Sequence, residues 1–123
     1  MLPHEEGNCW QTAIRELCES PCIKLGHNLI SFDRWWLAQK GTHLQGEIRD
    51  TLAIHHVLDP ASAHSLEFLV SRYLWEPWYK DEGQGHDQAK ITDWASYQAY
   101  CGLDAMCTRE LHDILWPQLE ARA

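Results

Sequence analysis

The chain has 123 residues, 45% of them hydrophobic, and its 18 acidic against 10 basic side chains give a net charge of −8. This length allows a single core and at most one domain. The charge disfavours a protein that grips nucleic acid through a broad basic face, because phosphate contacts need lysine and arginine. It is compatible with carboxylates that gather divalent cations, and also with an ordinary solvated acidic surface.

The sequence also bears on the cellular compartment and on the redox state of the cysteines. No apolar run approaches the roughly 20 residues of a membrane helix, and residues 1–6 lack the basic and apolar parts of a secretion signal. We therefore expect a soluble, cytoplasmic protein with five reduced cysteines. Cys18 and Cys22 together with eight histidines raise the alternative of zinc, but neither Cys-x-x-Cys nor His-x-x-x-His spacing occurs.

The first third of the chain predicts a helix, a strand, a sharp corner and a second helix. Apolar residues at helical spacing predict the first helix over 8–18, and Ser20-Pro21 ends it. Residues 22–25 predict a short buried strand, after which Gly26 allows a sharp backbone turn. A second helix is expected to run to about Gln39, with Gly41 as its stop.

Asp33 stands where this corner becomes the second helix. A carboxylate there projects from the carboxyl end of a sheet, which is where open α/β sheets place their ligands. The alternative interpretation is that Asp33 only caps the helix, a common use of aspartate. For Trp35 and Trp36 on the same helix we expect packing in the core.

The segment 48–54 reads as the end of a strand or the start of a short helix. Asp50 could pass for a catalytic carboxylate, but we expect it to satisfy nearby backbone groups, as short polar residues at element ends do. His55, His56 and His64 are expected to be surface or packing residues rather than metal ligands, since adjacent residues on a helix point apart.

Two further helices are expected. Asp59-Pro60 breaks the chain, and Ser65 starts a helix that places Leu66, Leu69, Val70 and Tyr73 on one face. Residues 75–85 predict a loop with aromatics on the core. We expect Lys80 in this loop to be an ordinary solvated residue, and contact with a DNA backbone is the alternative.

The last helix is predicted from about residue 93, capped by Thr92 or Asp93, to 115, with Pro117 as its stop. Tyr100 and Asp104 stand one turn apart on the same side, and Gly102 between them indicates close approach by another backbone or a substrate. The inward stripe of this helix is expected to consist of Trp94, Tyr97, Cys101, Leu111 and Leu115.

Two of these patterns follow one another along the chain. Asn28-x-x-x-Phe32-Asp33 is followed, after Asp50-Thr51 and residues 65–69, by Tyr100-x-x-x-Asp104. The arrangement resembles the second and third motifs of the tyrosine-bearing DEDD 3'-5' exonucleases, most closely the proofreading domain of family A DNA polymerases, especially phage-type ones. The resemblance covers about residues 9–119. It implies a helix-rich α/β chain with a partial ribonuclease H-like (DnaQ-like exonuclease) fold.

The resemblance also implies a site. Asp33, Tyr100 and Asp104 would be catalytic: Asp104 would ligate the first of two Mg²⁺ or Mn²⁺ ions, Asp33 would hold the second through its water shell, and Tyr100 would orient the attacking water. Hard ions of this kind prefer oxygen ligands. The residues implied at the 3' end of a single-stranded DNA substrate are Asn28, Leu29 and Phe32.

One departure from the family pattern bears on activity. The family carries Asp-x-Glu on its first strand, and no aspartate of this chain has a glutamate two positions later. We therefore expect residues 1–123 to form a single, incomplete domain that lacks the N-terminal strands and is inactive alone. A polymerase domain, a complementing exonuclease fragment or a homodimer would cover the exposed sheet edge. The alternative is a non-catalytic module that binds nucleic acid or protein. The sequence leaves open whether the substrate is DNA or RNA. It also leaves open whether the chain is encoded by a phage and acts in the cytoplasm of the host cell.

Overall fold

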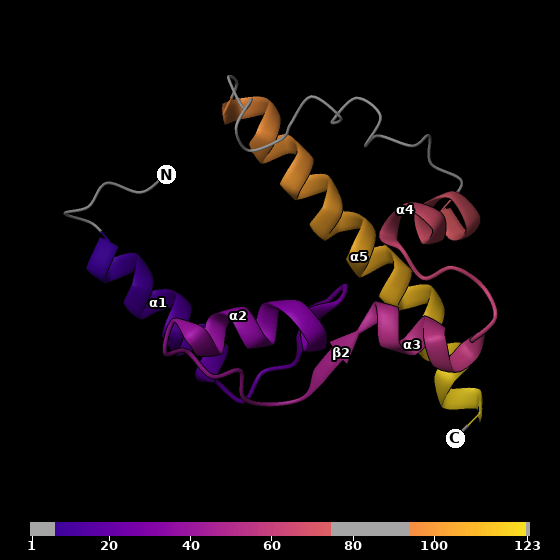
Figure 1. The fold of residues 1–123 in the computed structure, drawn as a ribbon, viewed down its shortest axis with the longest axis horizontal. Coiled ribbons are helices and arrows are strands. Elements are labelled where there is room, and N and C mark those ends of the chain that lie inside the picture. The colour runs from indigo at the N-terminus through magenta and orange to yellow at the C-terminus, as the bar shows by residue number, and fades with distance from the viewer. Residues whose placement is uncertain (1–6, 75–93, 123) are drawn as a thin grey trace. The chain divides into compact units, whose positions relative to one another are not determined.

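In the structure, a computed structural model that describes residues 7–74 and 94–122, the chain divides into two compact units, Met1–Asp50 and Thr51–Ala123. Figure 1 follows the elements from α1 in indigo to α5, which ends in yellow. The expected loop over residues 75–85, Lys80, and the cap at Thr92 or Asp93 lie outside the described residues.

The N-terminal unit is a helix, a strand, a bent helix and a second strand. Strands β1 (Lys24–Gly26) and β2 (Ile48–Asp50) pair in parallel, with Lys24 opposite Ile48 and Gly26 opposite Asp50. Parallel neighbours need a crossover between them, which the bent helix supplies. The elements are α1 (Gly7–Glu19), β1, the π-helical turn η2 (Leu29–Asp33), α2 (Arg34–Gln39) and β2.

These elements confirm the expected helix over 8–18, the stop after Gln39 and a short strand in the 48–54 segment. Gly41 adopts a φ of 83°, which glycine reaches without steric cost, and so it ends α2 as expected. The first strand begins at Lys24 rather than at residue 22, and Ile23 before it is 53% exposed. The chain is thus a helix-rich α/β protein with a two-stranded parallel sheet.

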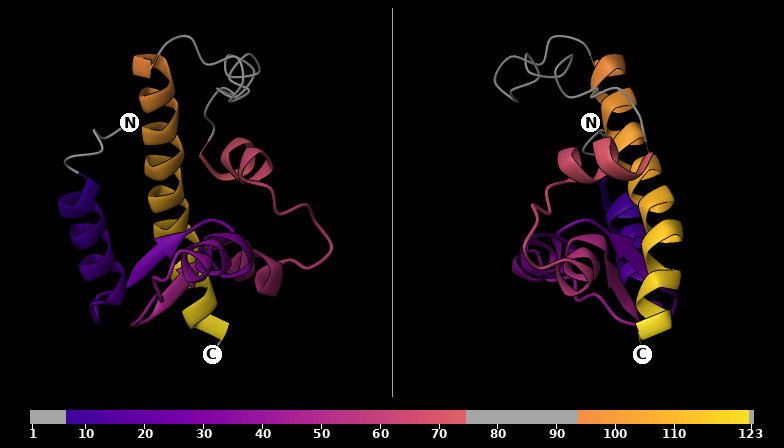
Figure 2. Two further views of the ribbon diagram at one scale, coloured as in Figure 1. Left: turned by 60° about the vertical axis from the view of Figure 1, so that its left-hand side comes forward. Right: turned by 90° about the vertical axis from the view of Figure 1, so that its right-hand side faces the viewer.

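The C-terminal unit packs short helices against one face of α5, a helix that both views of Figure 2 show running unbroken from orange to yellow. Its elements are α3 (Thr51–Leu58), α4 (Leu66–Leu69), the π-helical turn η3 (Val70–Leu74) and α5 (Trp94–Arg122). Ser65 caps α4 by accepting a hydrogen bond from the N–H of Phe68 at 3.2 Å, which confirms the expected start of that helix.

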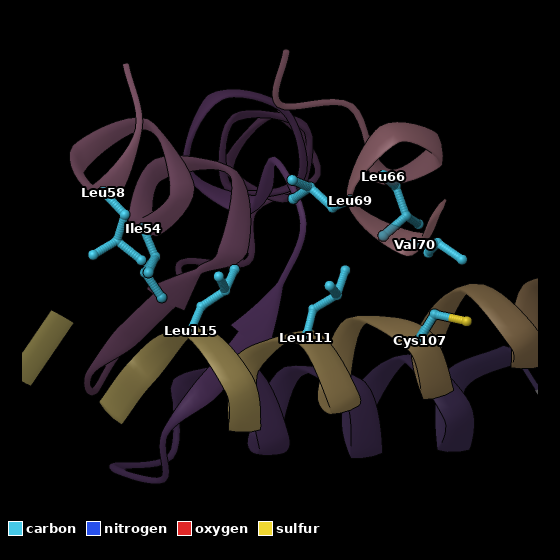
Figure 3. Packing of buried hydrophobic residues seen from close by; sticks show 8 residues of the cluster. All are labelled: Ile54, Leu58, Leu66, Leu69, Val70, Cys107, Leu111 and Leu115. Carbon is cyan, nitrogen blue, oxygen red and sulfur yellow. The ribbon is translucent and has the colours of Figure 1, made fainter. Parts of the chain in front are cut away.

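Figure 3 shows the core of this unit, in which α5 side chains face the short helices. Leu69, Val70, Leu111 and Leu115 are completely buried, and Cys107 is 1% exposed. Ile54 and Leu58 of α3 and Leu66 of α4 complete the cluster. Burial of this apolar area is the main force that holds α3, α4 and α5 together.

The long helix corrects two expectations. Its buried stripe begins at Cys107, whereas Trp94 is 50% exposed and Cys101 is also exposed. Among residues 7–74 and 94–122, the buried core cluster includes no α5 residue before Cys107. The helix also continues past Pro117 to Arg122. Proline removes one helical hydrogen bond, but buried Leu115 and a 3.0 Å bond from Arg122 Nη1 to the Leu58 carbonyl hold the last turns in place.

A histidine network lies beside this core. His55 is fully buried; its Nδ1 lies 2.6 Å from Nδ1 of His64, and its Nε2 lies 3.2 Å from the Tyr73 hydroxyl. The other ring nitrogen of His64 contacts His56 at 3.2 Å. His55 is therefore a packing residue, as expected. In the described part of the chain, no helix is both long enough and apolar enough to cross a membrane.

We predict that Leu111→Ala lowers the free energy of unfolding by about 2–5 kcal/mol, since the substitution leaves a cavity in a closed core. Leu103→Ala is the matched control on the same helix. That side chain is 38% exposed, and its loss should change stability by less than about 1 kcal/mol. Urea denaturation followed by circular dichroism measures both, and equal effects would contradict the assignment of this core.

We also predict that stability falls in acid. Burial, and secondarily the charges of His64 and Arg72, hold the pKa of His55 below its usual value, while Asp59 opposes them. As the pH falls, His55 therefore binds a proton in the unfolded chain before it does so in the folded chain. The His55 contribution is complete above about pH 6.5 and is lost as the pH falls from there through the folded-state pKa, by at most about 1.4 kcal/mol per unit.

Thermal unfolding between pH 7.5 and pH 5 measures this slope. His55→Gln should flatten it, whereas exposed His43→Gln should leave it unchanged. A wild-type slope that His55→Gln retains would mean that another group is responsible.

Candidate functional site

The corner between β1 and α2 is formed by an unusual backbone at Asn28. This residue has φ 63° and ψ 29°, the left-handed conformation that asparagine tolerates better than most residues. The sharp turn expected at Gly26 is therefore made two residues later. Gly26 serves close packing instead, because a Cβ there would lie 3.0 Å from the Cβ of Leu29.

Asp50 holds this corner from the neighbouring strand. Its carboxylate is 4% exposed and accepts two backbone hydrogen bonds, from Asn28 N–H at 2.8 Å and from Ile30 N–H at 3.0 Å. Hydrogen bonds to a charged acceptor are stronger than neutral ones. The expectation that Asp50 satisfies nearby backbone groups is confirmed, and its two bonds span the turn that leads into η2.

Asp33 follows at the end of the π-helical turn η2. Its backbone is already helical, with φ −64° and ψ −42°, and its side chain makes no capping hydrogen bond. The interpretation of Asp33 as a helix cap is therefore wrong. The carboxylate is half-buried, and its pKa is raised by that burial first and by the negative charge of Asp50 second. Single-turn π-helices are frequent at functional sites.

The side chains around Asp33 differ in accessibility. Phe32 is 58% exposed, so its ring is open to a ligand, whereas Leu29 is buried at 9% and Asn28 is half-buried. Trp35 and Trp36 are 60% and 47% exposed, which contradicts the expected core packing. The reason is that α2 is only six residues long and buries none of its side chains in this structure.

Tyr100 and Asp104 lie one turn apart on α5, and both are half-buried. The three residues between them, Cys101, Gly102 and Leu103, are exposed. Their common helix side is as expected. Thr108 donates its hydroxyl to the Asp104 carbonyl at 2.7 Å, which fixes the turn that follows. Among the described residues, a Cβ on Gly102 would meet no atom within 4 Å, so none of their backbone makes the expected close approach, and approach by a substrate stays a prediction.

Metal-binding capacity is limited in the described ranges. Within residues 7–74 and 94–122, no three histidine, cysteine or acidic side chains lie where they could share a metal ion. Asp33 and Asp104 offer the oxygen donors that a hard cation prefers, one from each unit. What the sequence alone missed is the charge coupling of Asp33 to Asp50, which the β1–β2 register makes possible by setting Asp50 opposite Gly26.

Comparisons with known proteins agree with one another. The profile of a 3'-5' exonuclease family matches residues 1–120. A DNA polymerase I of Synechocystis sp. is 39% identical over 94 residues, which is 72% of this chain and 9% of that protein. A DNA polymerase I of Pseudomonas aeruginosa is 34% identical over 118 residues, or 89% of this chain and 13% of that protein. The chain thus spans a small part of these relatives.

We predict that Asp50→Asn loosens the corner. An amide retains one acceptor but directs an NH₂ group at a backbone N–H, and an unsatisfied buried donor costs about 1–3 kcal/mol. Amide hydrogen exchange at residues 28 and 30 should accelerate accordingly. The control is Asp59→Asn, whose lost partner is the exposed Arg72 at 3.0 Å and which should leave both amides unchanged. Unaltered exchange in Asp50→Asn would refute the anchoring role.

Proposed function

The chain belongs to the 3'-5' exonuclease family of DNA polymerase I-like proteins, and we propose that it hydrolyses the 3'-terminal phosphodiester of single-stranded DNA when a complementing segment is present. The observation that carries this proposal is the family match over residues 1–120, which includes Asp33, Tyr100 and Asp104. The proposed fold is a partial ribonuclease H-like one, with residues 1–123 forming one incomplete domain.

The state of Asp33 supports a catalytic role. A carboxylate used only for structure would be expected to cap α2, yet Asp33 makes no such bond. Its raised pKa reflects partial burial and a second carboxylate, Asp50, close by. Such a pairing of acidic groups is relieved by a bound cation, and perturbed carboxylates are enriched at functional sites.

The proposed metal ligands are Asp33 and Asp104, which suit Mg²⁺ or Mn²⁺ in donor type but not in number. Divalent ions in such a site neutralise the scissile phosphate and lower the pKa of a bound water. The protein's own part is positional. We assign to the Tyr100 hydroxyl the orientation of the attacking water by a hydrogen bond.

The substrate end is assigned to the corner. Exposed Phe32 offers a ring face to a terminal base, and aromatic stacking of this kind tolerates any sequence. We assign half-buried Asn28 and buried Leu29, which packs at Gly26, to contacts with the same terminal nucleotides.

The remaining carboxylates must come from elsewhere, since these 123 residues contain no Asp-x-Glu. We assign them to a segment of a polymerase or to a separate exonuclease fragment, which would pair with an edge of the sheet formed by β1 and β2. A second copy of the chain is the other partner proposed for that edge, and cytoplasm is the proposed compartment. The absent motif also keeps a second function as the alternative, a non-catalytic module that binds nucleic acid or protein.

Hydrolysis separates the two functions. Single-stranded DNA labelled at its 5' end is incubated with Mn²⁺ and the chain, with and without a family segment that carries Asp-x-Glu. We expect stepwise 3' shortening only in the mixture. Asp33→Ala and Asp104→Ala should each reduce it by more than about 100-fold, because even outer-shell partners of a metal contribute 10–100-fold.

Tyr100→Phe tests the hydroxyl while keeping the ring, and it should reduce the rate without affecting DNA binding. Asp113→Ala is the matched control, an exposed carboxylate on the same helix that should leave the rate unchanged. Retained DNA binding with no shortening in any mixture would overturn the enzymatic proposal and leave the binding module.

A further inference from the structure

A pocket separate from Asp33 lies within the N-terminal unit, between α1 and α2. Its volume is about 560 Å³, within the range of ligand sites in proteins. One wall consists of Gln11, Ile14 and Arg15, which are three and four residues apart and so share a face of α1. The facing wall consists of Trp36 and Leu37 of α2 and of Lys40, the residue that follows this helix.

The charge of this pocket differs from that of the chain. Two of its lining residues are cations and none is acidic, whereas the whole protein carries a net charge of −8. The Lys40 ammonium lies 5.5 Å from the centroid of a Trp36 ring, and that tryptophan is 47% exposed. Arg15 has only a loose 3.9 Å ion pair with Glu19, in which both side chains are about half exposed. Such a pair contributes little and is readily exchanged for another anion.

We propose that this pocket is a binding subsite for single-stranded DNA, with a base stacked on Trp36 and the adjacent phosphates held by Arg15 and Lys40. An exposed aromatic platform flanked by cations is the physical basis of sequence-tolerant single-strand binding. An acidic peptide would use the cations but not the ring. The combination therefore favours a nucleotide.

The position of the pocket fits a strand whose 3' end lies at Asp33, and to that extent the inference rests on the proposed function. Asp33 ends η2, Trp36 and Leu37 lie on α2, and Lys40 is the residue that follows it. Their spacing of i, i+3, i+4 and i+7 places them on one side of this helical segment. Seven residues of helix rise about 10 Å. Stacked DNA rises about 3.4 Å per nucleotide. The subsite thus receives a nucleotide about three positions from the cleaved end.

The test measures binding without cleavage. A short oligodeoxythymidylate with a 5' fluorescein is titrated with the full chain in EDTA, and its anisotropy is followed. Trp36→Ala should weaken binding roughly ten-fold or more, as loss of one base stack does. Trp35→Ala is the matched control: this neighbour is 60% exposed but does not line the pocket, and its loss should leave the affinity unchanged.

Salt dependence tests the cations. Arg15→Glu with Lys40→Glu should reduce the slope of log affinity against log salt by about 1.4, or 0.7 per phosphate contact. Arg109→Glu, at an exposed arginine of α5, should not alter it. No measurable binding, equal loss in both tryptophan variants, or polyglutamate binding with the same dependence on Trp36 would each overturn the proposal. Because EDTA prevents hydrolysis, failure of the proposed exonuclease activity leaves this result unaffected.

Discussion

The hydrogen bonds from Asn28 N–H and Ile30 N–H to the buried carboxylate of Asp50 are the constraint on which the N-terminal unit depends. They join the end of β2 to the turn after β1, and so they tie the parallel register to the geometry of the corner. A left-handed residue and a π-helical turn are both unfavourable in isolation. The charged acceptor compensates for them where η2 begins, and the direction of α2 follows from that arrangement.

Two consequences for chemistry come from the same carboxylate. Asp50 adds negative charge near Asp33, so the site favours protons or cations more than an isolated aspartate would. It also fixes the start of the helical segment that places Trp36 and Lys40 on one side. One buried side chain thus supports both the proposed metal-binding carboxylate of Asp33 and the proposed DNA subsite.

In the C-terminal unit, the main constraint is the packing of α5 against the short helices. Tyr100 and Asp104 lie on turns of α5 that precede its buried stripe, and Cys107, Leu111 and Leu115 anchor the rest of that helix against α3 and α4. A helix fixed over several turns keeps the preceding turns in line by its own hydrogen bonds. Tyr100 and Asp104 can therefore remain half-buried on a rigid support, as the catalytic role proposed for them requires.

Short-range patterns in the sequence determined much of this protein. Helical spacing and stop signals located α1, α4 and most of α5, and the paired motifs led to the exonuclease family that the comparisons confirm. The backbone-satisfying role of Asp50 was also predictable from residue type and position. The helix positions depend on neighbours within a few residues, whose side-chain preferences act locally, whereas the backbone partners of Asp50 are 20 and 22 residues away and were not predicted by name.

Only the tertiary structure decided what depends on distant partners. It moved the turn from Gly26 to Asn28, carried α5 beyond Pro117 and left the tryptophans of α2 exposed. It also placed Arg15 opposite Trp36 to form a pocket. In each case the outcome depends on residues that are distant in the sequence. The carboxylate of Asp50 is 22 residues from Asn28, and Arg122 bonds to Leu58 across 64 residues. Local propensity contains no information about such contacts, because their free energy arises only when the chain is folded.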